Sequence, residues 1–291
     1  MKSLIQNGVE IMVYPVVGKG FSGYLKNISK LKRYLLANKV DIIHAHYSYS
    51  GYLCAIAGAK PLVVSLMGSD VYEKLYYRFL IRFFNKFYWN ACIVKSEQMA
   101  RISDIKNSQL IPNGVDLKTF SIVPKDVARK DLGLDIKKQY VLFAADPTRK
   151  EKNFLLAKGA FDKIDQTVDL LIVNNKTQEE LNLFYNAVDV VLLTSHYEGS
   201  PNVIKEAMTC NCPIVTTDVG DVQKIIGDTD GYWISLFEEK DLIKKIEQAL
   251  DYATLIGRTK GRERIISLGL DSESVSKRIV QVYETVINSK Q

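Results

Sequence analysis

The chain has 291 residues, of which 47% are hydrophobic and 25% are charged, a composition typical of a globular protein with two domains. Its net charge of +6 is too modest to indicate nucleic-acid binding, although a basic face could meet anionic lipid or a phosphorylated substrate. No apolar run of about 18 residues and no signal peptide are present, so we expect a cytoplasmic protein with reduced cysteines.

The N-terminal segment predicts a helix end followed by a strand. Residues 2–8 have the pattern of a last helical turn stopped by a glycine, and residues 9–17 predict a strand. Residues 18–23 match the G-x-G-x-x-G dinucleotide fingerprint. The acid about 20 residues further on, Asp41, precedes the next strand instead of ending it, so it cannot reach a ribose at the carboxyl edge. A flexible loop at an interdomain cleft is therefore favoured over NAD binding.

Two histidines end the next predicted strand, residues 41–46. The side chains of His44 and His46 point the same way, because side chains alternate along a strand. They are either hydrogen-bonded histidines at a strand end or metal ligands, and no third ligand lies nearby in the sequence. Residues 61–66 predict another buried strand, followed by Asp70.

Residues 72–90 are dense in aromatic and basic side chains. As a helix, this segment is apolar over most of its surface and places Arg78, Arg82 and Lys86 on one stripe. One interpretation is a helix packed on the sheet with a basic edge. The other is a face that lies on an anionic membrane, and both can hold at once.

The second half repeats the alternation of strands and helices. A strand over residues 91–96 precedes the turn at 112–114, and residues 118–125 are the expected linker. Further elements are expected as strands over 140–145, 168–174 and 188–194, a helix opened by the capping box 177–180, an amphipathic helix over 238–252 and a last helix from 272. Cys210 and Cys212 could suggest zinc, but without a second ligand pair buried thiols are favoured, as for Cys54 and Cys92.

The richest stretch is the strand, loop and helix over residues 188–208. Ser200 suits an N-cap and Pro201 suits the first helical position, so the helix would point free N–H groups at an anion such as phosphate. Glu198 and Glu206 flank this cradle. Carboxylates beside a phosphate repel it unless they accept hydrogen bonds from sugar hydroxyls, so a nucleotide-sugar is favoured. The bland alternative is an ordinary crossover with surface glutamates.

This stretch resembles the Glu, seven residues, Glu motif of retaining glycosyltransferases of family 4, which have the GT-B fold. The segments that carry the resemblance are 198–202, 205–208, 213–217, the His-x-His of 44–46 and the Pro-Asn-Gly-Val-Asp of 112–116. Met67 stands where many relatives have a histidine, and the Gly-Arg pair usual before Arg149 is missing. The interval after residue 174 is condensed, and the family's usual first strand and glycine loop are expected to be missing, which puts activity in doubt.

The resemblance implies an α/β fold with two Rossmann-like domains facing across a cleft. The N-terminal, acceptor-side domain would comprise residues 1–118, joined by a C-terminal helix, 272–291, that crosses back to it. Residues 119–271 would form the nucleotide-sugar-binding domain.

The resemblance also implies transfer of a sugar, with retention and without metal or cofactor, from a nucleotide-diphosphate sugar to a glycan or lipid-linked acceptor in cell-surface polysaccharide or glycolipid synthesis. The expected catalytic residues are His46, Glu198, Arg149 and Lys152. The expected donor-binding residues are Asn113, Gly114, Gly199, Ser200, Pro201, Asn202, Val203 and Glu206, and the expected acceptor-side residues are His44 and Asp70. The protein would be cytoplasmic or peripheral on the inner face of the membrane. A catalytically silent or truncated nucleotide-sugar-binding protein and a GT-B-type epimerase are the alternatives.

Overall fold

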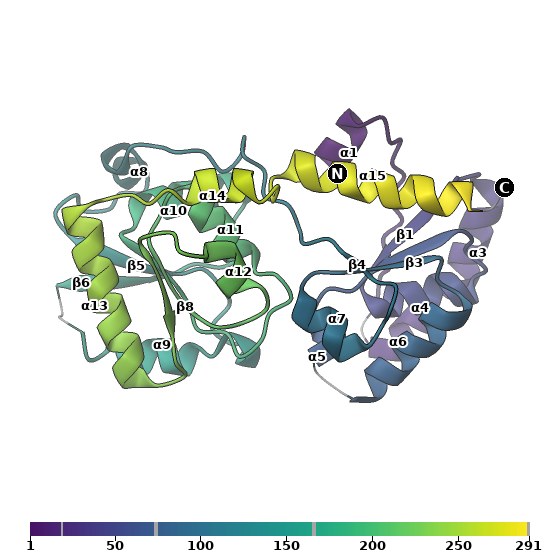
Figure 1. Cartoon of the computed structure of the whole chain (residues 1–291), viewed down its shortest axis with the longest axis horizontal. Coiled ribbons are helices and arrows are strands. Elements are labelled where there is room, and N and C mark those ends of the chain that lie inside the picture. Colours follow the sequence, from purple (N-terminus) through teal and green to yellow (C-terminus); the bar gives the residue numbers. More distant parts are fainter. Residues whose placement is uncertain (19, 73–74, 165–166, 290–291) are drawn as a thin grey trace. The chain divides into compact units, whose positions relative to one another are not determined.

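A computed structural model of the chain describes residues 1–18, 20–72, 75–164 and 167–289. The chain forms two compact units, and the C-terminal segment belongs to the first (Figure 1). Unit 1 comprises Met1–Asn113 with Glu273–Gln291, and unit 2 comprises Gly114–Ser272. Each unit is a parallel sheet with helices packed on it, so the α/β fold class is confirmed.

The sheet of unit 1 has four parallel strands in the order β1-β2-β3-β4. They are β1 (Ile43–His46), β2 (Leu62–Ser65), β3 (Ala91–Val94) and β4 (Gln109–Leu110). Every residue of β2 is buried, as expected for a parallel strand covered on both faces. The register places His46 opposite Ser65, so the polar ends of β1 and β2 lie together at the carboxyl edge.

Helices cover both faces of this sheet, and they come from both parts of the chain that make up unit 1. They are α1 (Lys2–Gln6), α2 (Gly20–Leu25), α3 (Ile28–Ala37), α4 (Ser48–Ile56), α5 (Ser69–Tyr72), α6 (Leu75–Phe87), α7 (Glu97–Ser103) and α15 (Ser272–Asn288). The apolar stripe of α15 includes Val275 and Val282, which form one core cluster with Val63 of β2 and Ile93 of β3. The return of the last helix to the first unit is therefore observed.

The predicted strand over residues 9–17 is wrong. These residues have no regular secondary structure and pair with no strand among the described residues, and β1 is an edge of the sheet. A β-rich segment becomes a strand only when a neighbour supplies ladder hydrogen bonds. Instead, Tyr14 and Val16 pack their side chains against the core of unit 1. The glycine fingerprint is also not a simple loop, because α2 begins at Gly20; Lys19 lies outside the described residues.

Unit 2 contains five parallel strands in the order β6-β5-β7-β8-β9. They are β5 (Gln139–Phe143), β6 (Val168–Ile172), β7 (Val190–Leu193), β8 (Ile214–Thr217) and β9 (Tyr232–Ser235). The helices are α8 (Lys125–Asp131), the 3-10 turn η1 (Lys150–Lys152), α9 (Phe154–Phe161), α10 (Gln178–Ala187), α11 (Asn202–Thr209), α12 (Val222–Ile226), α13 (Glu239–Leu255) and α14 (Gly261–Ser267).

Two local predictions for unit 2 are confirmed. Thr177 and Glu180 form the capping box of α10, each side chain bonding the other residue's backbone N–H. On α13, Leu242, Ile246 and Leu250 are buried against the sheet, as the amphipathic pattern predicts.

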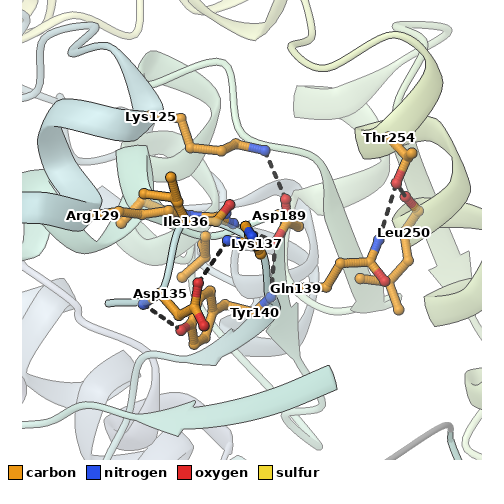
Figure 2. A network of polar contacts seen from close by, with 12 residues as sticks. Lys125, Arg129, Asp135, Ile136, Lys137, Gln139, Tyr140, Asp189, Leu250 and Thr254 are labelled. Atoms are coloured by element: carbon orange, nitrogen blue, oxygen red, sulfur yellow. Dashed lines mark hydrogen bonds and ion pairs between the residues drawn. The ribbon is translucent and has the colours of Figure 1, made fainter. Parts of the chain in front are cut away.

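A buried ion-pair network centred on Asp189 lies directly before β7 (Figure 2). Asp189 accepts hydrogen bonds from Lys125 Nζ at 2.7 Å and from the Arg129 guanidinium at 2.8 Å. It also accepts the backbone N–H of Tyr140 at 2.7 Å, so one carboxylate ties α8 to β5 and β7. Because Asp189 is desolvated and fully occupied, its place is structural.

The two ends of unit 2 lie side by side. Val115 and Asp271 form a parallel bridge, flanked by bonds from Val115 N to Leu270 O and from Ser272 N to Val115 O. A Cβ on Gly114 would lie 2.7 Å from the Ser272 Cα, so only glycine fits this approach. The segment 118–125 belongs to unit 2, where Arg262 donates to the carbonyls of Leu117 and Phe120.

Candidate functional site

Three loops of unit 2 carry most of the polar residues singled out from the sequence. They follow β5, β7 and β8, so they meet at the carboxyl edge of the parallel sheet, where α/β folds bind their ligands. Arg149 and Lys152 come from the first loop, Glu198 to Pro201 from the second and Gly220 with Asp221 from the third.

Glu198 is held by a lysine and a serine. Its Oε1 accepts hydrogen bonds from Lys152 Nζ at 2.5 Å and from Ser195 Oγ at 2.8 Å. The Thr194 hydroxyl bonds the carbonyls of Lys152 and Asn153, each at 3.0 Å. The loop after β5 is therefore fastened to the end of β7, and Lys152 and Glu198 form an ion pair there; their roles in catalysis stay predictions.

Arg149 lies further out in the same loop. Its Nε donates to Glu151 Oε1 at 2.7 Å, and more than half of the Arg149 side chain is exposed. The backbone of Glu151 accepts a hydrogen bond from His196 N at 2.8 Å. Glu151 is thus a partner for the predicted cation that the sequence analysis missed.

Ser200 does not cap the helix, which corrects the predicted cap. Helix α11 begins at Asn202, its N-cap is Pro201, and no side chain makes a cap bond there. The Ser200 hydroxyl accepts a hydrogen bond from Lys205 Nζ at 3.0 Å and is also bonded to the Asp221 carboxylate. Since this hydroxyl is engaged behind the loop, only the backbone of Ser200 is left to face a ligand.

Lys205 is a buried titratable group, and Asp221 beside it is partly buried. Burial lowers the pKa of Lys205 to about 8, although Asp221 and Glu206 oppose the shift. Burial raises the pKa of Asp221 to about 6, against the opposing effect of the Lys205 ammonium. An ammonium ion therefore lies under the first turn of α11, adding positive potential where the free N–H groups of the helix point.

Glu206 lies in the second turn of α11 and faces α10. Its Oε2 accepts a hydrogen bond from the Tyr185 hydroxyl at 2.8 Å. Burial raises the pKa of Glu206, while the Tyr185 bond and Lys205 favour its ionised form. Oε1 of the same carboxylate remains available for a further donor, as the predicted ribose contact requires.

The other predicted donor-binding residues line the same turn with different exposures. Gly199 and Pro201 are buried, Asn202 is exposed, and Val203 packs partly against the core. Gly220 has φ of +63°, and a Cβ there would lie 2.7 Å from the carbonyl oxygen of Gly199. The loop after β8 is thus pressed against the backbone of the Glu198–Gly199 turn.

A hollow of about 440 Å³ lies beside this loop, lined by Asn153, Leu156, His196 and Phe237. The rings of His196 and Phe237 are stacked, with centroids 5.8 Å apart. No sequence pattern marks Phe237 as a site residue, because a phenylalanine after a strand is common in any α/β fold.

In unit 1 the two histidines lie together at the end of β1. Their rings stack with centroids 4.4 Å apart, as the alternation predicts. His44 Nδ1 lies 2.6 Å from the Tyr283 hydroxyl and Nε2 lies 2.8 Å from Ser65 Oγ. Burial, then His46 and Lys95, holds the pKa of His44 well below its usual value. The His46 ring is exposed, and burial together with Lys95 lowers its pKa too.

Asp70 is buried beneath the loops that follow β1 and β2. It accepts the backbone N–H groups of Ser48, Met67 and Gly68 at 2.9–3.0 Å. Burial raises its pKa, and these bonds oppose the rise. Asp70 therefore shapes the loop beside His46, and its contact with an acceptor stays a prediction.

Asn113 and Gly114 lie where the chain passes from unit 1 to unit 2. The close approach of Gly114 to Ser272 explains why glycine is required at this position, which no sequence pattern indicated. Their role in donor binding stays a prediction.

Helix α6 has one buried and one exposed apolar face. Ile81 is fully buried, and Phe84 packs partly against the core. Phe79 is 71% exposed, and Phe83 and Phe87 follow at four-residue spacing with 42% and 58% exposure. Arg78 and Arg82 use their Nε atoms to bond the carbonyls of Val71 and Ser103. Residues 73 and 74 of the predicted segment 72–90 lie outside the described residues.

Across the described ranges, no group of three or more His, Cys, Asp or Glu side chains could hold a metal ion. All four cysteines are buried free thiols, as favoured from the sequence. Among the helices of those ranges, none is both long and apolar enough to cross a bilayer.

Two family models match most of the chain. The model described as Glycosyltransferase Family 4 matches residues 5–119, and the model described as Glycosyl transferases group 1 matches residues 163–266. The chain is 25% identical to the putative teichuronic acid biosynthesis glycosyltransferase TuaC of Bacillus subtilis over 64% of its own length and 55% of that protein's.

One further relative and one solved structure cover more of the chain. It is 24% identical to the UDP-Gal:alpha-D-GlcNAc-diphosphoundecaprenol alpha-1,3-galactosyltransferase of Escherichia coli, over 91% of this chain and 81% of that one. Its fold matches the solved sucrose-phosphate synthase of Thermosynechococcus elongatus with a TM-score of 0.79 at 21% identity, over 95% of this chain and 81% of that one. From the motif residues, the parallel-sheet units and these matches together, the chain belongs to glycosyltransferase family 4 and has the GT-B fold.

Proposed function

We propose that this chain is a retaining, metal-independent glycosyltransferase that moves a hexose from a nucleotide-diphosphate sugar to an acceptor hydroxyl. The observation that carries the proposal is the pair of carboxylates on either side of the start of α11. Glu198 is held by Lys152 and Ser195 before the helix, and Glu206 is held by Tyr185 within it.

In the proposed complex the donor lies along this edge of unit 2. Glu206 accepts the ribose hydroxyls, the N–H groups at the start of α11 bind the diphosphate, and Glu198 contacts the sugar. Arg149 and Lys152 neutralise the departing phosphate, and the buried Lys205 adds its charge from behind the loop. Both outer cations, Arg149 and Lys152, are paired with carboxylates, so donor binding would exchange these partners for phosphate oxygens.

Cations and helix N–H groups can stabilise the leaving diphosphate without a metal. In the proposed reaction the anomeric carbon loses its bond to the phosphate oxygen and gains one to the acceptor oxygen on the same face. The acceptor proton passes to the leaving phosphate, which serves as the base. We assign His46 to the neighbourhood of the reacting carbon and the acceptor.

The acceptor is proposed to be a glycan or a lipid-linked sugar in cell-surface polysaccharide or glycolipid synthesis. The names of the two bacterial relatives, one acting in teichuronic acid biosynthesis and the other on a diphosphoundecaprenol-linked sugar, support this class. The exposed Phe79, Phe83 and Phe87 row of α6 would rest on the anionic inner face of the membrane, near such an acceptor.

The first test is thermal stabilisation of the chain by UDP, GDP and ADP in turn. A nucleotide at 100 times its dissociation constant should add about 2.7 kcal/mol to stability. We expect a shift with one nucleotide and its loss in Glu206→Ala. No shift with any nucleotide would overturn the donor assignment.

The second test follows the sugar. The matching nucleotide-sugar is incubated with membrane lipid extract and excess chelator, and the anomeric configuration of the product is read by NMR. Retained configuration with undiminished transfer supports the proposal. Inversion, or activity that disappears with the metal, contradicts its mechanism. Binding without transfer would support a silent binding protein, and an altered sugar without acceptor would support an epimerase.

A further inference from the structure

The C-terminal helix reaches the histidine pair of unit 1 through one side chain. Tyr283 of α15 is 239 residues away from His44 in the sequence, yet its hydroxyl lies 2.6 Å from His44 Nδ1. The two rings meet edge to face, with centroids 5.6 Å apart. The tyrosine is 8% exposed, so this bond is protected from water.

Both nitrogens of His44 are engaged, which fixes the plane of its ring. The second nitrogen, Nε2, lies 2.8 Å from the Ser65 hydroxyl on the neighbouring strand. A tyrosine hydroxyl is more acidic than a serine hydroxyl, and burial raises the pKa of Tyr283 to about 12, so it keeps its proton throughout neutral pH. Tyr283 therefore donates to Nδ1, and Nε2–H donates to Ser65, which selects one neutral tautomer of His44.

His46 rests on this fixed ring. The centroids of His44 and His46 are 4.4 Å apart and the rings are within 24° of parallel. The Lys95 ammonium acts on both rings, and the amino group of the chain acts on His46. A charged His44 would disfavour protonation of His46, so the neutral state of the His44 ring influences the charge of the His46 ring.

We propose that Tyr283 is a positioning residue for His46: its hydroxyl holds His44 as the neutral Nε2–H tautomer, and this ring sets the orientation and proton affinity of His46. The inference rests on the proposed function only in placing His46 near the reacting carbon. It gives the returning helix a part in the site, beyond covering the sheet.

The experiment uses the small number of histidines. The chain has three, His44, His46 and His196, so nitrogen NMR of the ¹⁵N-histidine-labelled protein resolves each ring, its tautomer and its titration. In the native chain we expect one ring to show a pure Nε2–H tautomer and no protonation from pH 8 down to pH 5. Either a pure Nδ1–H tautomer or a doubly protonated His44 in this range would overturn the proposal.

Tyr283→Phe removes the hydroxyl and keeps the ring. Loss of a bond to the neutral form raises the pKa of His44, and we expect mixed tautomers and a shift of at least about 0.5 pH units in the titration of His46. The His196 signals should not move. Unchanged His44 and His46 signals in this variant would also overturn the proposal.

Two control variants separate positioning from packing. Val286→Ala loosens the same helix without touching His44, and Tyr88→Phe removes a hydroxyl from another part of unit 1. Both should keep the native tautomer and titration. If Val286→Ala reproduces the Tyr283→Phe spectra, Tyr283 acts by packing alone and the proposal fails. These spectra need neither donor nor acceptor, so their outcome is distinct from that of the nucleotide test.

Discussion

The Glu198 carboxylate accepts a hydrogen bond from Lys152 Nζ at 2.5 Å, and both side chains are mostly shielded from solvent. Lys152, the cation proposed for the leaving phosphate, and Glu198, the acid proposed for the sugar, therefore form one ion pair. Each side chain holds the other in place, and substitutions can test their proposed contacts with phosphate and with sugar separately.

Replacing the two members of this pair should give different binding losses. We expect Glu198→Gln to weaken binding of the nucleotide-sugar by about 1–3 kcal/mol, because a charged hydrogen-bond acceptor is lost, and to leave binding of the free nucleotide unchanged. Lys152→Met should weaken both, since it removes charge from the phosphates. Calorimetry with the nucleotide and its sugar conjugate measures the difference. Equal losses for the two ligands in Glu198→Gln would exclude a contact with the sugar.

Glu206→Ala should weaken nucleotide binding by about 1–3 kcal/mol through loss of the ribose contact. Tyr185→Phe is the matched control, because it removes only the hydroxyl that supports Glu206 and leaves the carboxylate in place. We expect a smaller loss for Tyr185→Phe in the same calorimetric titration. A nucleotide affinity that survives Glu206→Ala would remove the ribose assignment.

The buried Lys205 should make stability depend on pH in the alkaline range. Its folded pKa, about 8, is below the ordinary 10.5, so the folded state penalises the ammonium. The contribution of Lys205 to the free energy of unfolding is fully present above the unfolded pKa of 10.5. It is lost as pH falls through the folded pKa of about 8. The free energy of unfolding should therefore rise from pH 8 to 10.5 by up to about 3 kcal/mol more in the native chain than in Lys205→Met.

The comparison is made by urea unfolding at several pH values. Lys244→Met, which removes an exposed lysine of α13, is the control and should keep the native pH profile. A Lys205→Met profile parallel to the native one would show that the buried amine is not penalised.

Gly220 and Gly133 offer a matched pair of glycines. Both have positive φ, of +63° and +67°, but only a Cβ on Gly220 meets the backbone of the Gly199 turn, whereas nothing lies within 4 Å of one on Gly133. Alanine at either site should cost about 1–2 kcal/mol for the left-handed backbone. Gly220→Ala should cost at least about 1 kcal/mol more from overpacking, and should weaken nucleotide binding.

Denaturant unfolding and nucleotide titration of the two glycine variants provide the measurement. Native nucleotide affinity in Gly220→Ala would mean that the Glu198–Gly199 turn tolerates displacement. Equal destabilisation of the two variants would mean that the turn yields to the new methyl group at little cost.

The exposed phenylalanine row of α6 should bind vesicles containing phosphatidylglycerol. Removing Phe79 and Phe87 together, as serines, should lower the partition into vesicles by about tenfold or more, since tenfold corresponds to only 1.4 kcal/mol. Leu155→Ser, at a side chain of unit 2 that is 85% exposed, is the control. Co-sedimentation at low and high salt measures the effect, and absence of binding by the native chain at low salt would exclude the membrane contact.

The sequence predicted features that depend on local patterns. Strand alternation placed His44 and His46 on one side, and the Thr177 capping box began α10 where expected. Side-chain partners brought together by tertiary packing were missed, such as Tyr283 beside His44 and Asp221 beside Ser200. No local pattern connects residues so far apart in the chain.

The strand over residues 9–17 failed for a related reason. Its composition satisfies the local preference for an extended backbone, but a strand also needs a hydrogen-bonding neighbour, which is a property of the whole sheet. The Ser200 cap failed because Lys205 and Asp221 compete for the hydroxyl that would have bonded the helix.

The bridge between Val115 and Asp271 has an evolutionary consequence. Unit 2 is one uninterrupted insert between two parts of unit 1, and its entry and exit are adjacent, paired backbone segments. An insert whose ends already touch can be exchanged as a cassette without stretching its host. Recombination at these two positions would exchange unit 2 as a whole and leave unit 1 intact, so the paired crossings are natural breakpoints for domain exchange.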